Sequence, residues 1–236
     1  MAGDARMSPS AGSRRDRLNS EKVAYWYLRL NGFLQIEDFY VHPSGRGGAR
    51  TDADLLAVRF PHRAERLYDN PEDIMNDDFS GLSLSREKTD IVIAEVKSSQ
   101  CALNGPWTDL DRKNVHRVLA AIGCFSHDRI ERAAERIYET GCYEDETGLR
   151  VRLVAIGREE NGVVRMKYPN VSQVVWNHLL GFIYDRFRKY RHQKRQTDHW
   201  DATGKRLKQR STQQGMNRDD FIDWAVSAMG VERPHT

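Results

Sequence analysis

The chain of 236 residues is long enough for one sizeable core, and its 39% hydrophobic and 30% charged residues are typical of a soluble globular protein. Its formal net charge of +3 is too small to establish a polyanionic partner, because an overall balance says little about local fields. The sequence has no apolar run of membrane-spanning length, no secretory apolar core and no cysteine pair at zinc-binding spacing, so we expect a cytoplasmic protein without membrane or zinc.

The first element predicted along the chain is a helix over 21–30, capped by Asn19 or Ser20 and ending at an Asn-Gly pair. Residues 1–17 before it are rich in Ser, Gly, Ala and Arg with almost no apolar content, so we expect a disordered leader. Glu21 shares a helical stripe with apolar residues and would extend the face that packs on a sheet. Judged alone, Glu21 is better interpreted as an ordinary first-turn glutamate favoured by the helix dipole.

Two short apolar runs, 51–60 and 90–97, carry charges where a buried strand should carry none. Side chains two apart in a strand share a face, so Asp54 lies on the apolar face of the first run, and Glu95 and Lys97 lie on that of the second. If the runs pair antiparallel, the start of the first lies beside the end of the second. The three charged side chains would then converge at one edge of an apolar face.

The chemistry expected of this cluster is that of a metal site. Two carboxylates so close repel unless a cation lies between them, and hard oxygen ligands suit Mg²⁺ or Mn²⁺. A lysine beside the cation can stabilise developing negative charge or orient a water, as metal-assisted phosphodiester hydrolysis requires. The alternative interpretation is a strand-end salt-bridge cluster, because so short a pattern arises by chance in many chains.

Asp54, followed about forty residues later by Glu95-Val96-Lys97 with each motif on an apolar strand, resembles the PD-(D/E)xK nuclease superfamily. That superfamily includes many restriction endonucleases and archaeal Holliday junction resolvases. The helix with Glu21 resembles the first helix of small resolvase-like members, in which a glutamate completes the metal site. The resemblance covers roughly residues 18–100. The first motif lacks the proline of the superfamily's name, as it does in many members.

The resemblance implies a role for each residue that matches the motif. Asp54, Glu95 and the backbone carbonyl of Val96 would bind Mg²⁺ or Mn²⁺. Lys97 would position the nucleophile or stabilise the transition state, and Glu21 would bind a second cation or orient metal-bound water. Many relatives act as dimers, which leaves a homodimer open.

The remaining elements complete an α/β protein with a mixed central sheet flanked by helices. In chain order they are an irregular strand over 33–41, a glycine-rich hairpin loop over 43–48, a solvated acidic loop over 61–88, helices over 109–122 and 126–138, strands over 149–157 and 163–168, a long helix from Asn170, and an amphipathic helix over 217–229. The resemblance implies a restriction endonuclease-like core. We expect residues 18–185 to form this nuclease-like α/β domain and residues 186–236 to form an additional basic helical C-terminal extension.

The stretch 186–210 contains ten Lys or Arg against two Asp, interleaved with aromatic residues. Basic residues with aromatics among them suit contacts with a nucleic-acid backbone and stacking on unpaired bases. Basic helix ends are also common in proteins without such a partner. The predicted nucleic-acid contacts are Arg186, Arg188, Lys189, Arg191, Lys194 and Arg195.

Taken together, the sequence predicts a divalent-metal-dependent endonuclease or exonuclease that hydrolyses phosphodiester bonds in nucleic acid, with DNA as the expected substrate. The first alternative is a nucleic-acid-binding or regulatory module of the same fold without turnover. The second is an interaction protein whose basic tail binds an acidic partner.

Overall fold

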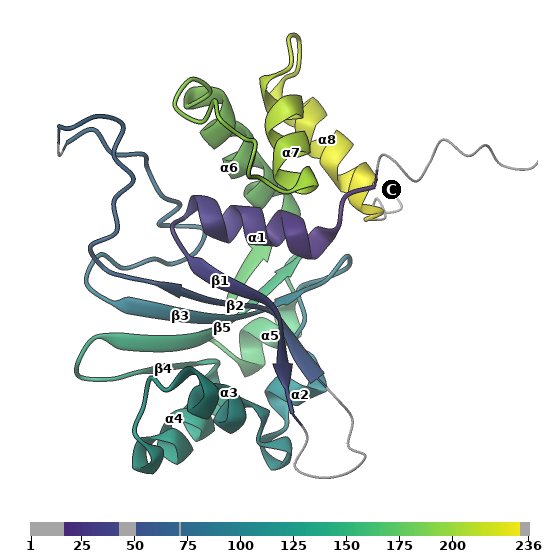
Figure 1. Ribbon diagram of the computed structural model, residues 1–236. Coiled ribbons are helices and arrows are strands. Elements are labelled where there is room, and N and C mark those ends of the chain that lie inside the picture. The colour runs from purple at the N-terminus through teal and green to yellow at the C-terminus, as the bar shows by residue number, and fades with distance from the viewer. Residues whose placement is uncertain (1–16, 43–50, 71, 232–236) are drawn as a thin grey trace, which may run out of the picture.

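The computed structural model describes residues 17–42, 51–70 and 72–231, and its strands form one mixed sheet with helices on both faces (Figure 1). The strands are β1 (Leu34–Val41), β2 (Thr51–Arg59), β3 (Thr89–Val96), β4 (Cys142–Glu144), β5 (Leu149–Gly157) and β6 (Ser172–Val175). Their order is β1–β2–β3–β5–β4, and β6 also pairs with β5. The pairs β3–β5 and β5–β6 are parallel and the others antiparallel, so the predicted mixed sheet is confirmed.

The helices form a layer on each face of the sheet (Figure 1). They are α1 (Ser20–Leu30), α2 (Gly105–Thr108), the 3-10 helix η1 (Leu110–Arg112), α3 (Asn114–Ile122), α4 (His127–Thr140), α5 (Gly162–Lys167), α6 (Trp176–Lys189), α7 (Ala202–Thr212) and α8 (Arg218–Met229). Buried residues of α1, α6, α7 and α8 form one hydrophobic cluster, and those of α2 to α5 form a second on the opposite face. No helix in the described segments is long and apolar enough to cross a membrane.

Most predicted elements are present, and three predictions are wrong in an informative way. Residues 163–168 form α5 instead of a strand, because the Asn161 side chain accepts from the Val163 and Val164 N–H groups and caps a helix. The predicted helix over 109–122 is interrupted before α3 by Lys113, whose φ is 52°. The long helix expected from Asn170 begins with β6, because that valine-rich run pairs with β5.

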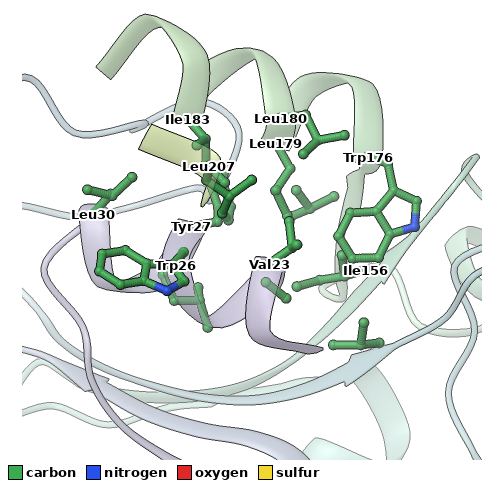
Figure 2. Packing of buried hydrophobic residues seen from close by; sticks show 14 of the residues in the cluster. Val23, Trp26, Tyr27, Leu30, Ile156, Trp176, Leu179, Leu180, Ile183 and Leu207 are labelled. Carbon is green, nitrogen blue, oxygen red and sulfur yellow. The ribbon is translucent and has the colours of Figure 1, made fainter. Parts of the chain in front are cut away.

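The helices after residue 185 belong to the same packed body as the first helix. Figure 2 shows Trp26 and Tyr27 of α1 together with Ile183 of α6 and Leu207 of α7. The predicted boundary between 185 and 186 therefore falls inside α6, whose two halves pack continuously. The predicted leader up to residue 16 and the glycine-rich loop 43–48 lie outside the described residues.

The segment between β2 and β3 contains an internal ion-pair network, so the expected solvated acidic loop is wrong for Asp77 and Asp78, although Glu72 is exposed. The side chain of Asp77 is 5% exposed and accepts from the guanidinium of Arg59 at 2.9 Å and that of Arg186 at 3.1 Å. Asp78 accepts from the Tyr27 hydroxyl at 2.6 Å. Burial of these acids is favourable because each is paired with a cation or a hydrogen-bond donor. The segment thereby joins β2 to α1 and α6.

The first half of β3 is fixed to β5 by a second buried ion-pair group. The Asp90 carboxylate accepts from Arg150 Nε at 3.0 Å and from Arg152 Nε at 2.9 Å, and Asp90 lies opposite Arg150 in the parallel ladder. Arg152 also donates to the backbone oxygen of Leu82. β3 is therefore firmly placed before it reaches the charged motif at its other end.

Candidate active site

Asp54 and Glu95 are brought together at the end of the β2–β3 ladder. Leu55 lies opposite Ala94 in the antiparallel register, so Asp54, the residue before Leu55, lies opposite Glu95, the residue after Ala94. The Asp54 Oδ2 atom accepts a hydrogen bond from the Val96 N–H at 2.6 Å. The two motifs, 41 positions apart in sequence, are thus connected directly.

Glu95 is buried on the face of the sheet that α2 and α3 cover. Ile91 and Ile93, four and two residues earlier, lie in the hydrophobic cluster on that face. The Glu95 residue is only 2% exposed, and three donors surround its carboxylate. Trp107 Nε1 donates to Oε2 at 2.8 Å, and Lys97 Nζ and Asn104 Nδ2 both donate to Oε1. The carboxylate therefore has a fixed position and a partly compensated charge.

The backbone of Lys97 is held from both sides. Its N–H donates to the Ile156 carbonyl of β5 at 2.8 Å, and its carbonyl accepts from Trp176 Nε1 at 3.0 Å. Its side chain is 27% exposed, so the ammonium group reaches solvent while it remains paired with Glu95. The ammonium group of Lys97 is therefore accessible from solvent at the end of β3.

The loop after Lys97 passes so close to β5 that residue 157 must be glycine. A Cβ at Gly157 would lie 2.5 Å from the Cys101 backbone nitrogen and 2.8 Å from the Ser99 carbonyl oxygen. We expect Gly157→Ala to lower the free energy of unfolding by about 1–3 kcal/mol, because backbone atoms cannot move aside as a flexible side chain can. The same displacement should disturb the position of Lys97.

Gly162→Ala is the matched control for Gly157→Ala, since a Cβ at Gly162 meets nothing within 4 Å. We expect this variant to stay within about 0.5 kcal/mol of wild type. Urea unfolding of both variants provides the measurement. Equal stabilities for the two variants would contradict the proposed tight contact.

Burial disfavours the ionised form of both carboxylates of the site. Burial raises the pKa of Asp54 and outweighs the Val96 N–H and the Lys97 charge, which lower it. Burial also raises the pKa of Glu95; the hydrogen bond from Lys97 opposes this shift and the charge of Asp54 adds to it. Two acids with raised pKa values at one point form an environment that a bound cation would stabilise.

Glu21, at the first turn of α1, is also affected by the charge of Asp54. Its pKa is raised first by burial and next by the charge of Asp54, followed by those of Asp38 and Asp52. The charge of Glu21 therefore interacts unfavourably with that of Asp54, and the place of Glu21 in a metal site stays a prediction. Asp38, which we did not select from the sequence, has a φ of 49° and interrupts the pairing of β1 with β2 at the position facing Asp54.

The oxygen donors at the ladder end fit a hard divalent cation. The described residues contain no group of three or more His, Cys, Asp or Glu side chains arranged to hold a metal ion. Mg²⁺, however, is usually bound by one or two carboxylates, with water and substrate phosphate completing its octahedron. Asp54 and Glu95 would supply these carboxylates. The roles of Glu21 and of the Val96 carbonyl stay predictions.

Asn104, Trp107 and Trp176 were not predicted from the sequence as site residues, although the side chains of all three donate hydrogen bonds to the Glu95–Lys97 segment. The available signal was a tryptophan within the polar loop that follows the second motif. A large apolar side chain in such a loop indicates that the loop folds back onto a buried surface.

Two of the predicted nucleic-acid contacts are internal. The Arg186 side chain is 1% exposed and pairs with Asp77 and Glu65, and Lys194 pairs with Glu65. Phe187 of this stretch is also in the core, and the partly buried Trp200 packs against Trp26 and Phe187. Arg186 and Lys194 are therefore removed from the proposed binding surface. The exposed members of the predicted set are Arg188, Lys189, Arg191 and Arg195.

These exposed basic residues lie far from the paired motifs. Trp176 at the start of α6 touches Lys97, and the 14 residues of the helix then lead away from it. At 1.5 Å per residue, the basic end of α6 lies roughly 20 Å from Trp176. Only an extended ligand could contact both regions.

Comparison with protein-family models, with curated proteins and with solved structures found no match to this chain. The geometry of the site therefore carries the functional argument.

Proposed function

We propose that the protein is a divalent-metal-dependent nuclease with a restriction endonuclease-like core that hydrolyses phosphodiester bonds in DNA. The observation that carries the proposal is the meeting of Asp54 and Glu95 at one end of an antiparallel strand pair, with Lys97 beside them. An ordinary strand end does not require two neighbouring acids whose pKa values are both raised, chiefly by burial.

Asp54, Glu95 and the backbone carbonyl of Val96 are the groups that would hold Mg²⁺ or Mn²⁺. When bound, the cation lowers the pKa of its water and neutralises the phosphate. Lys97 is paired with Glu95 in the structure, and a cation on Glu95 would compete for that carboxylate. The freed ammonium group can then contact a phosphate oxygen or orient the attacking water.

The fold supports this assignment in two ways. The acidic motifs lie on neighbouring strands of a mixed sheet, and the helix with Glu21 precedes them in the chain, as in the superfamily that the motif resembles. The proposed role of Glu21 is to orient metal-bound water or to bind a second cation. Its half-buried position and the nearby charge of Asp54 are consistent with either role.

A duplex is the substrate form that best fits the distribution of charge. The separation of roughly 20 Å between Trp176 and the basic end of α6 corresponds to roughly six base pairs at about 3.4 Å each. Arg188, Lys189, Arg191 and Arg195 would contact the backbone of such a duplex at a distance from the scissile bond. These contacts would give affinity without sequence information.

The test is incubation of the full chain with plasmid, linear duplex and single-stranded DNA in Mg²⁺ or Mn²⁺. We expect cleavage that stops with EDTA and is absent in Glu95→Gln, which retains the size of the side chain. Cleavage by Glu95→Gln at the wild-type rate would assign the activity to a contaminant or another site and reject the proposal.

A second candidate is a DNA-binding module of the same fold without turnover. It is favoured by the three donors already on Glu95, which leave the carboxylate satisfied without metal. DNA affinity that falls steeply with salt, together with no measurable Mn²⁺ binding, would support this candidate over the nuclease.

A further inference from the structure

Two buried tryptophans hold the Glu95–Lys97 segment from opposite faces of the sheet. Trp107, in α2, belongs to the cluster on the α3 face, and Trp176, the first residue of α6, belongs to the cluster on the α1 face. Both indoles direct their only hydrogen-bond donor at this segment. The Glu95–Lys97 segment is therefore held by hydrogen bonds from both helical layers.

Trp107 acts on the carboxylate. It is 1% exposed, and its Nε1 lies 2.8 Å from Glu95 Oε2. A hydrogen bond to a charged acceptor is stronger than a neutral one, particularly where water is excluded. Asn104 donates to the other oxygen, Oε1, so both ends of the carboxylate are held and its plane is fixed.

Trp176 acts on the backbone. Its Nε1 donates to the Lys97 carbonyl at 3.0 Å, while the Lys97 N–H is already bonded to Ile156. Both polar groups of this peptide position are thereby occupied just after β3 ends. The direction in which the Lys97 side chain leaves the strand is consequently fixed by α6.

We propose that Trp107 and Trp176 are positioning residues of the candidate site, Trp107 together with Asn104 for the metal-binding carboxylate of Glu95 and Trp176 for Lys97. This inference rests on the proposed metal-dependent function. Partners of this kind orient a ligand without touching the metal, and their loss typically reduces metal affinity or activity about 10- to 100-fold.

The chain contains a matched control for the chemistry of Trp107. Trp26 is equally buried, and its Nε1 donates to the carboxylate of Asp201, the residue that caps α7, at 3.1 and 3.2 Å. Trp26→Phe and Trp107→Phe therefore remove the same kind of hydrogen bond and keep an aromatic ring. Only the second change affects the candidate site.

The experiment measures Mn²⁺ affinity of the full chain by isothermal titration calorimetry, with thermal unfolding of each variant in parallel. Trp107→Phe is expected to weaken Mn²⁺ binding about tenfold or more, while Trp26→Phe lowers the melting temperature and stays within about twofold of wild-type affinity. Trp176→Phe should leave Mn²⁺ affinity near that of wild type and reduce kcat with little change in KM. Asn104→Leu alters an exposed residue, so it reports on the same carboxylate even if Trp107→Phe does not fold.

Each outcome of this experiment is decisive. Wild-type Mn²⁺ affinity in Trp107→Phe, or in Asn104→Leu if the former does not fold, would overturn the positioning role. An equal loss of affinity in Trp26→Phe would also overturn it, because general destabilisation would then be the cause. A folded wild-type chain that binds no Mn²⁺ would instead overturn the proposed function, and the positioning inference with it.

Discussion

Asp54→Asn is expected to abolish Mn²⁺ binding and to reduce DNA cleavage by more than about a hundredfold, since even a partner outside the metal's own ligands contributes 10- to 100-fold. Asn keeps the size of the side chain and an oxygen that can accept from the Val96 N–H, so β2 and β3 should stay paired. Loss of function therefore reports on the charge of Asp54 and not on the fold.

The same variant should be at least as stable as wild type when metal is absent. Burial raises the pKa of Asp54 above the ordinary value of an aspartate, about 3.9, so the folded chain retains this proton to higher pH than the unfolded chain. The carboxylate then opposes folding as pH rises through this interval, and its effect disappears below the ordinary pKa. The stability gain of Asp54→Asn should therefore grow from acid towards neutral pH.

Metal should reverse the order of stabilities. A ligand that binds only the folded chain stabilises it by about 2.7 kcal/mol at one hundred times its Kd. Saturating Mn²⁺ should raise the melting temperature of wild type and leave that of Asp54→Asn unchanged. Calorimetry across pH, with and without Mn²⁺, tests both statements together.

The control for this variant is Asp52→Asn, which removes an exposed negative charge two residues earlier in the same strand. It should weaken Mn²⁺ binding at most about threefold, because the charge of an exposed side chain is well screened. Comparable losses in Asp52→Asn and Asp54→Asn would mean that general negative potential, and not a ligand at Asp54, attracts the ion.

The paired motifs were predictable because the information is local. Alternation of apolar residues identifies β2 and β3, and the charges of Asp54, Glu95 and Lys97 stand out against that background. Antiparallel pairing of neighbouring strands then brings the three together. The partners of Glu95 could not be predicted in this way, because the contact of Trp107 depends on how α2 folds back against the sheet.

The basic stretch shows the limit of counting charges. The partner that buries Arg186 is Asp77, which lies 109 positions earlier in the chain. A count of charges within a short stretch cannot reveal that one arginine of the stretch is paired with an acid that is distant in sequence. The charge pattern therefore overestimated the number of basic side chains that are available to a partner, although Arg188 and Lys189 on the same helix are exposed.

The errors around β6 and α5 have a related cause. Val171, Val174 and Val175 fit helical spacing as well as they fit a short strand, and periodicity alone cannot separate a short buried strand from a helix. Residues 172–175 form a strand because they pair with β5. Val163 and Val164 favour a strand by propensity, but the Asn161 cap and the absence of a ladder partner in the described residues place them in α5.

Asp90→Asn is expected to lower the free energy of unfolding by about 3–5 kcal/mol, the range found when one partner of a buried ion pair is removed. The Arg152 side chain is 2% exposed and that of Arg150 13% exposed, and both depend on the Asp90 carboxylate. An amide cannot accept hydrogen bonds at both ends, so part of the guanidinium donors would lose their acceptor. Urea unfolding at neutral pH gives the measurement.

Asp185→Asn is the matched control, because Asp185 pairs with Arg218 at the surface, where the two side chains are 60% and 46% exposed. Exposed pairs of this kind contribute at most about 1 kcal/mol. A loss in Asp90→Asn no larger than that in Asp185→Asn would show that the buried group does not fix β3 to β5.

The pH dependence of Asp90→Asn should have the opposite sign to that of Asp54→Asn. Burial alone would raise the pKa of Asp90, but the charges and hydrogen bonds of Arg152 and Arg150 outweigh it and hold the pKa below its usual value. The stabilising contribution is therefore complete above the ordinary aspartate pKa of about 3.9 and is lost as pH falls through the lower value of the folded chain. Wild type and Asp90→Asn should converge in stability in strong acid. β3 thus carries two carboxylates with opposite effects. Asp90 stabilises the fold in its ionised form, whereas burial of Glu95, five residues later, favours the neutral form of that acid.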